Sequence, residues 1–314
     1  MHRLREISDA SAPLATRADT IGVPFDVNRL VRSAAFAPQL VQLARGLIGS
    51  SQLALRTTSG LFATHQRWLL WHAVLAHYVN LGSARQVGLS RRAFPNLAMK
   101  HRMCAEGTAY TLFDDALDHE VMEPTGVVDN RGWQKAVPTD KAIALMVDWY
   151  RIHVEVLDWT DGGDRTEWLM ADPQQAFFLI QPAVAAGLLW APELCHPGPL
   201  YSIFTWADAG GLVMDRLMAG LEIDAVGKQE RLPIDVMSIL QLALATGLSR
   251  AHVSRKMAAA EQIGGIGWTG TKSQSPMWIS RGFYEEYARA QVHKLLILGG
   301  AIAGARHSLR LQCG

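Results

Sequence analysis

The chain has 314 residues, of which 49% are hydrophobic, and it carries a formal net charge of +1. This hydrophobic fraction allows a substantial core, and the length corresponds to two or three domains of ordinary size. The near-zero charge excludes a strongly basic polyanion binder, so any surface for nucleic acid must be a local patch.

The cysteines and the apolar segments indicate the cellular compartment of the protein. Cys104, Cys195 and Cys313 lie far apart and form neither a disulfide framework nor a zinc-binding pattern, which fits a reducing compartment. Residues 1–6 are not followed by the apolar segment of a secretory signal. The longest apolar stretch, 176–191, is interrupted and too short to span a membrane. We therefore expect a cytoplasmic protein without a membrane partner.

Helical spacing of apolar residues predicts a mainly α-helical protein. Strand-like segments are confined to 121–137 and 263–279, and each predicts a small β-hairpin between two helices. The order of elements around the hairpins recurs at a nearly constant offset, because Val253 corresponds to Ala109 and the helix cap Ser280 to Thr139. This similarity favours an internal duplication.

The predicted organisation has four parts. Residues 1–24 form a loose N-terminal arm, and 25–160 form a helical region with the first helix-turn-helix and hairpin. Residues 161–206 form a proline-rich helical connection. Residues 207–314 form the second helix-turn-helix and hairpin, with a final helix that packs or dimerises. The fold class predicted is thus mainly α, with two modules and their hairpins joined by a helical segment.

The strongest motif is the turn around Gly247. Glycine tolerates the left-handed conformation that ends a helix, and Ser249 is a good N-cap for the helix that follows. On that helix Val253 points inward and Arg255 lies on the opposite side. Arginine can contact guanine with two hydrogen bonds, and a local excess of positive charge attracts phosphates. The DNA-binding candidates are Ser249, Arg250, His252, Ser254, Arg255, Lys256, Trp268 and Lys272.

These residues resemble the winged helix-turn-helix regulators of bacteria. The matched positions are Ala243, Gly247 and Val253, followed by three segments that resemble a wing, at 264–268, 270–272 and 277–279. The resemblance implies that the hairpin lies beside the DNA backbone or minor groove. It also implies a sequence-specific transcriptional regulator whose partner is double-stranded DNA. Lys256 departs from the pattern, which usually has an apolar residue there.

Residues 67–159 resemble the MarR-like group of these regulators. The similarity consists of a wing tip at Asp129-Asn130-Arg131 and a long helix capped by Thr139. The second helix of this copy is expected from Thr108, after a turn at Gly107. Arg131 is the candidate DNA contact here. Whether this copy touches DNA is left open, because its second helix carries carboxylates that repel phosphate: Asp114, Asp115 and Asp118.

Other functions receive less support. No histidine pair has metalloprotease spacing, no phosphate loop is complete and no nucleophile–base pair stands out, so no enzyme, cofactor or metal site is expected. Asp158, Asp161 and Asp164 favour a helix-ending turn over a cation loop. The alternative function is a helical protein-interaction or scaffold module whose winged helices bind protein. A homodimer is left open, as is a small-molecule effector near the tryptophans of 149–206.

Overall fold

The computed structural model describes residues 26–58, 61, 64–205, 210–272 and 274–313. Within these ranges the chain is mainly helical and has two three-stranded antiparallel sheets, in the orders β1-β3-β2 and β4-β6-β5. The prediction of a mainly α-helical protein with two small hairpins is confirmed. The predicted arm, residues 1–24, lies outside the described residues.

The first sheet belongs to a set of consecutive elements that we call the first unit. It consists of α3 (His65–Asn80), β1 (Leu89–Ser90), α4 (Ala93–Lys100), α5 (Glu106–Asp118), β2 (Met122–Val128), β3 (Gln134–Pro138) and α6 (Asp140–Asp161). Strands β1 and β2 both pair antiparallel with β3. The predicted cap of α6 forms, since the Thr139 side chain accepts a hydrogen bond from the Ala142 amide.

The second unit repeats this order of elements and of strands. It consists of α11 (Gly211–Ala219), β4 (Arg231–Pro233), α12 (Ile239–Thr246), α13 (Arg250–Gln262), β5 (Ile266–Trp268), β6 (Met277–Ser280) and α14 (Arg281–Cys313). Strands β4 and β5 flank β6. The predicted cap of α14 also forms, because Ser280 Oγ accepts from the Phe283 amide at 3.1 Å.

The remaining helices lie before and between the units. They are α1 (Val27–Arg32), α2 (Ala37–Thr58), α7 (Arg165–Ala171), α8 (Pro173–Trp190), α9 (Pro192–Cys195) and α10 (Pro199–Thr205). Short 3-10 turns span Ala34–Phe36, Gly82–Val87 and Ile223–Ala225. Prolines start α8, α9 and α10, where the missing backbone N–H would have no intrahelical acceptor. The segment between the units is therefore helical although it is rich in proline.

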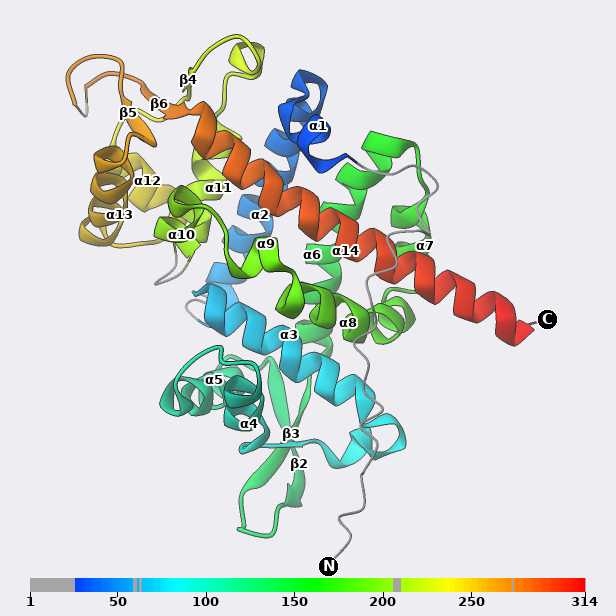
Figure 1. Cartoon of the computed structure of the whole chain (residues 1–314). Helices are drawn as coiled ribbons and strands as arrows, with labels where there is room; N and C mark the ends of the chain where they lie inside the picture. Colours follow the sequence, from blue (N-terminus) through cyan, green and yellow to red (C-terminus); the bar gives the residue numbers. More distant parts are fainter. Residues whose placement is uncertain (1–25, 59–60, 62–63, 206–209, 273, 314) are drawn as a thin grey trace, which may run out of the picture.

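Long helices fill the space between the two sheets, which lie at opposite ends of the molecule (Figure 1). Helix α14 packs against α6 and α8, α2 packs against α6 and α11, and α3 packs against α8. Helices α6 and α14 bury apolar stripes in this layer. Their buried members include Ile143, Met146, Phe283, Tyr287, Ala290 and Leu295.

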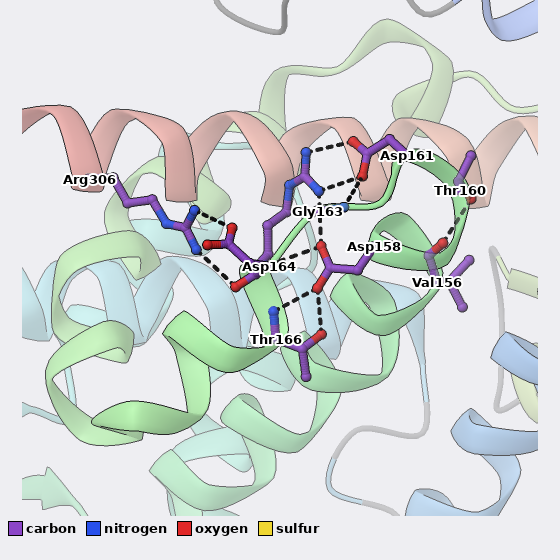
Figure 2. Close-up of polar contacts among 9 residues, drawn as sticks. Val156, Asp158, Thr160, Asp161, Gly163, Asp164, Thr166 and Arg306 are labelled. Carbon is purple, nitrogen blue, oxygen red and sulfur yellow. Dashed lines mark hydrogen bonds and ion pairs between the residues drawn. The ribbon is translucent and has the colours of Figure 1, made fainter.

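The acidic segment after α6 is a helix-ending turn, as the sequence favours. Gly162 ends α6 in the left-handed conformation, with φ of 72°. The three carboxylates bind arginines, and one of these pairs ties the turn to α14 (Figure 2). The ion pairs are Asp158–Arg165 at 2.9 Å, Asp161–Arg165 at 2.7 Å and Asp164–Arg306 at 2.6 Å.

Candidate nucleic-acid interface

The turn between α12 and α13 is built by two serine caps and a glycine. Ser238 Oγ accepts from the Gln241 amide at 3.1 Å, and Ser249 Oγ accepts from the His252 amide at 3.2 Å. Gly247 lies between the helices with φ of 67°, a conformation that other residues rarely adopt. The inward face of α13 is fully buried and anchors the helix through Val253, Met257 and Ala260.

The outward face of α13 carries two arginines, Arg250 and Arg255, and both are exposed. Arg250 forms no ion pair with any residue that the structure describes, while Arg255 approaches His252, with Nη2 3.5 Å from Nδ1. The face combines guanidinium groups with small side chains, a composition that suits a major groove. The neighbouring small or half-buried side chains are Ala251, His252, Ser254 and Ala258.

Lys256 does not belong to this face, which corrects the sequence prediction. Its side chain is 8% exposed, and Nζ donates to the carbonyl oxygen of Ile203 in α10 at 2.7 Å. Lys256 follows Val253 by three positions, so both side chains lie over the same inward side of the helix. The amine therefore satisfies a backbone carbonyl and ties α13 to α10. The prediction that Lys256 contacts DNA is wrong.

The hairpin β5–β6 places Trp268 and Lys272 beside α13. Trp268 is half-buried in β5, opposite Met277 in β6. Lys272 lies in the exposed loop, but its Nζ is 2.5 Å from a carboxylate oxygen of Glu261 at the end of α13. The charge of Lys272 is thus compensated within the protein.

The second unit has a further exposed cation that the sequence does not indicate. Arg231 in β4 is exposed, and its guanidinium carbon lies 4.7 Å from the ring centroid of Trp278 in β6. Strand β4 has three residues, too few to show the alternation that identifies a strand. Arg231 therefore joins the candidate interface only through the pairing of β4 with β6.

Helix α12 exposes apolar side chains. Leu240 is 53% exposed and Leu244 is 76% exposed, and Met237 before the helix is 50% exposed. The helix begins at Ile239, after the Ser238 cap, and its buried side chains are Leu242, Ala243 and Thr246.

In the first unit the turn between the corresponding helices precedes its predicted position. Helix α4 ends at Lys100 and α5 begins at Glu106, so Gly107 lies within α5. Arg102 adopts the left-handed conformation in this turn, with φ of 52°. Glu106 in the first turn of α5 is favourable because a carboxylate stabilises the positive end of the helix dipole. The prediction of a turn at Gly107 is wrong for these reasons.

Two of the three aspartates on α5 are paired with arginines. Nε of Arg91 donates to Asp114 Oδ1 at 2.8 Å, and Arg67 of α3 pairs with Asp115. Asp118 is exposed and has no such partner in the described part of the chain. Helix α5 therefore presents less free negative charge than its sequence suggests.

A cleft of about 770 Å³ lies between the start of α4, helix α5 and the hairpin β2–β3. Arg91 is held inside it between two rings, 4.5 Å from the Tyr110 centroid and 5.1 Å from that of Trp133. Trp133 is 52% exposed. The cationic side chains that line the cleft are Arg91, Arg92, Arg131 and Lys135.

Arg131 lies at the exposed tip of this hairpin, where the sequence places the wing tip. The turn is held by Asp129, whose Oδ1 accepts from the amides of Arg131 and Trp133 at 2.9 and 3.0 Å. Gly132 completes the turn with φ of 81°. The turn therefore fixes the backbone that carries Arg131 and Trp133, which both line the cleft.

No protein-family profile, curated protein or solved structure matches the chain. Among the described residues, no helix has the length and apolarity needed to cross a membrane. Nor does that part of the chain contain a group of three or more His, Cys, Asp and Glu side chains that could hold a metal ion.

Proposed function

We propose that the protein is a sequence-specific, DNA-binding transcriptional regulator of the cytoplasm, similar to the MarR-like group. In this proposal each unit is a winged helix-turn-helix, with α13 or α5 as the recognition helix and the hairpin as the wing. The repeated order of helix, strand, two helices, hairpin and helix supports it. The observation that carries the proposal is the exposed pair Arg250 and Arg255 on α13, beside the hairpin β5–β6.

The proposed mechanism assigns a role to each exposed cation. Arg255 lies opposite the buried Val253, so it points into the major groove when α13 enters it and can contact a base edge. Arg250 stands at the first position of α13, near a phosphate of the groove wall. Arg231 lies beside the hairpin and contributes a further phosphate contact. Lys272 contacts DNA only by exchanging Glu261 for a phosphate.

Retention on random-sequence duplex DNA tests the proposal. The chain should bind at low salt and elute as salt rises, because neutralising phosphates releases counterions. The variant Arg250→Ala/Arg255→Ala should elute at lower salt. A control with the same charge change, Arg29→Ala/Arg310→Ala, should behave like the unmodified chain because Arg29 lies in α1 and Arg310 in the last turn of α14, outside α13 and both hairpins. No retention of the unmodified chain at low salt would reject the proposal.

A protein-interaction module is the second candidate. The exposed apolar side chains on and before α12, Met237, Leu240 and Leu244, favour it, because an apolar stripe on a short helix is a common contact surface. The variant Leu240→Ser/Leu244→Ser separates the two functions. It should retain duplex binding if DNA is the partner. If the second candidate is correct, the chain should fail to bind duplex DNA and should self-associate through this stripe, and the variant should not.

A further inference from the structure

The cleft of the first unit has the chemistry of a phosphate-binding surface. Of its cations, Arg91 is neutralised by Asp114, whereas Arg92, Arg131 and Lys135 form no ion pair within the described part of the chain. Asp129 is the carboxylate that lines the cleft, and its Oδ1 accepts hydrogen bonds from two amides of the hairpin turn. The cleft therefore has an excess of positive charge, although the chain as a whole is nearly neutral.

The walls of the cleft also suit a sugar–phosphate strand. Trp133 presents a ring that is 52% exposed, and Asn96 supplies an amide. Exposed aromatic rings beside cations are typical of surfaces that contact nucleic acids. Arg91 is fixed between Tyr110 and Trp133, so the Trp133 ring is held in place before any ligand binds.

The cleft lies beside the hairpin of the first unit, as the proposed DNA face lies beside the hairpin of the second. It is formed by the hairpin β2–β3 and the segment from β1 to the start of α4, and Tyr110 is its lining residue from α5. In Figure 1 the hairpins of the two units lie apart, at the upper left and at the bottom, while α5 and α13 both lie on the left of the view. One duplex would have to run past both units to contact them together.

The two units would not read the same sequence. Helix α13 exposes Arg250 and Arg255, whereas α5 exposes no cation; its exposed residues are Glu106, Gly107, Thr108, Thr111 and Asp118. In the first unit the free cations lie on the cleft walls, away from the helix that corresponds to α13. Contacts of that kind position a duplex without reading its bases.

We propose that a single chain holds one duplex with both units, through base contacts from α13 and phosphate contacts from the cleft of the first unit. The DNA site is therefore asymmetric: one half is recognised through its bases, and the other is contacted mainly at its sugar–phosphate backbone. This inference rests on the proposed function, because it assumes that α13 binds DNA.

Two measurements on the full chain test it: the slope of log affinity against log salt, and the hydroxyl-radical footprint on a selected duplex. The variant Arg92→Ala/Lys135→Ala should make the slope shallower by about 2, since each phosphate contact contributes roughly 0.9. It should also remove protection at one end of the footprint while the protected bases of the other end stay unchanged. Arg29→Ala/Arg310→Ala is the charge-matched control and should change neither quantity.

The outcomes separate this inference from the proposed function. If Arg250→Ala/Arg255→Ala weakens binding but Arg92→Ala/Lys135→Ala behaves like the control, α13 binds DNA and the inference is wrong. If neither pair of changes affects binding, the proposed function is wrong as well. A mononucleotide that binds the cleft, with DNA affinity unaffected by Arg92→Ala/Lys135→Ala, would make the cleft a small-molecule site and overturn the inference. A symmetric footprint from two chains would also overturn it.

Discussion

The two units share an order of elements but use their charges differently. In the first, Arg67 and Arg91 neutralise two aspartates of the acidic helix α5, and the unpaired cations line a cleft beside it. In the second, arginines stand on α13 itself, and the hairpin lysine is paired with Glu261. The charged residues in the sequence of a helix therefore do not by themselves give the charge of its surface. Partners from neighbouring elements decide which charges remain free.

Lowering the pH should have the largest effect, a loss of folding stability, because it protonates buried histidines on the helices through which the two units pack. His72 of α3 and His153 of α6 are fully buried, and burial, with Lys294 of α14 nearby, lowers the pKa of each to about 3. The folded state therefore binds fewer protons than the unfolded state, whose histidines titrate near 6.5. Their contribution to stability is complete above pH 6.5 and is lost as pH falls toward the folded pKa.

The loss should be on the order of 1.4 kcal/mol per histidine for each pH unit below 6.5. Urea unfolding measured from pH 7.5 to 4.5 checks it. The variant His72→Leu should reduce this pH dependence without abolishing it, because His153 and His65, whose pKa burial lowers to about 4, still titrate. An equally steep decline in the variant would show that other groups cause the acid sensitivity.

Arg255→Ala should have the next largest effect. If Arg255 makes a two-hydrogen-bond contact to a base, its loss should cost roughly 1–3 kcal/mol of binding free energy and relax the sequence preference. Fluorescence anisotropy on a selected duplex and on single-base variants of it measures both. The matched control is Arg29→Ala, which removes an exposed arginine of α1 and should leave DNA affinity unchanged. An equal loss on all duplexes would show that Arg255 contacts only phosphate.

Asp114→Asn should produce a smaller and opposite change. Removing this carboxylate leaves Arg91 without its ion pair, so the positive charge of the cleft rises by one. Duplex affinity should rise by a few-fold at low salt, and the gain should disappear as salt screens it. The control Asp118→Asn removes an exposed carboxylate that has no arginine partner in the described residues. Weaker binding of Asp114→Asn would mean that the Arg91–Asp114 pair is needed to shape the cleft.

Lys272→Ala should have the smallest effect. The pair that it forms with Glu261 is exposed, and such pairs contribute about 0–1 kcal/mol to stability. A thermal melt should show little change, and duplex affinity should fall less than it does for Arg255→Ala. A loss as large as that of Arg255→Ala would show that the hairpin loop, and not α13, dominates binding in the second unit.

Local sequence signals predicted much of the fold. Gly247 and Ser249 fixed the turn before α13, and Thr139 and Ser280 marked the starts of α6 and α14, because capping depends on residues close in sequence. The hairpins followed from glycines and short extended runs. Strands β1 and β4 were not predicted, since two or three residues show no alternation and owe their conformation to pairing.

The candidate site was less predictable because it depends on contacts between distant elements. The sequence predicts that Lys256 faces outward, but its amine binds the carbonyl oxygen of Ile203 in α10, 53 positions away. The acidity of α5 was overestimated because Arg67 and Arg91 belong to other elements. The cleft joins α4, α5 and a hairpin, so no single segment of sequence could indicate it.

The central claim is that α13 is the main DNA contact, and one comparison tests it directly. Duplex affinity should be measured against salt for the unmodified chain, for Arg250→Ala/Arg255→Ala and for Arg131→Ala. The account predicts that the double change on α13 abolishes most affinity and flattens the salt dependence, whereas Arg131→Ala has a small effect. Binding that survives the loss of Arg250 and Arg255 but collapses with Arg131→Ala would contradict it and assign the main contact to the first unit.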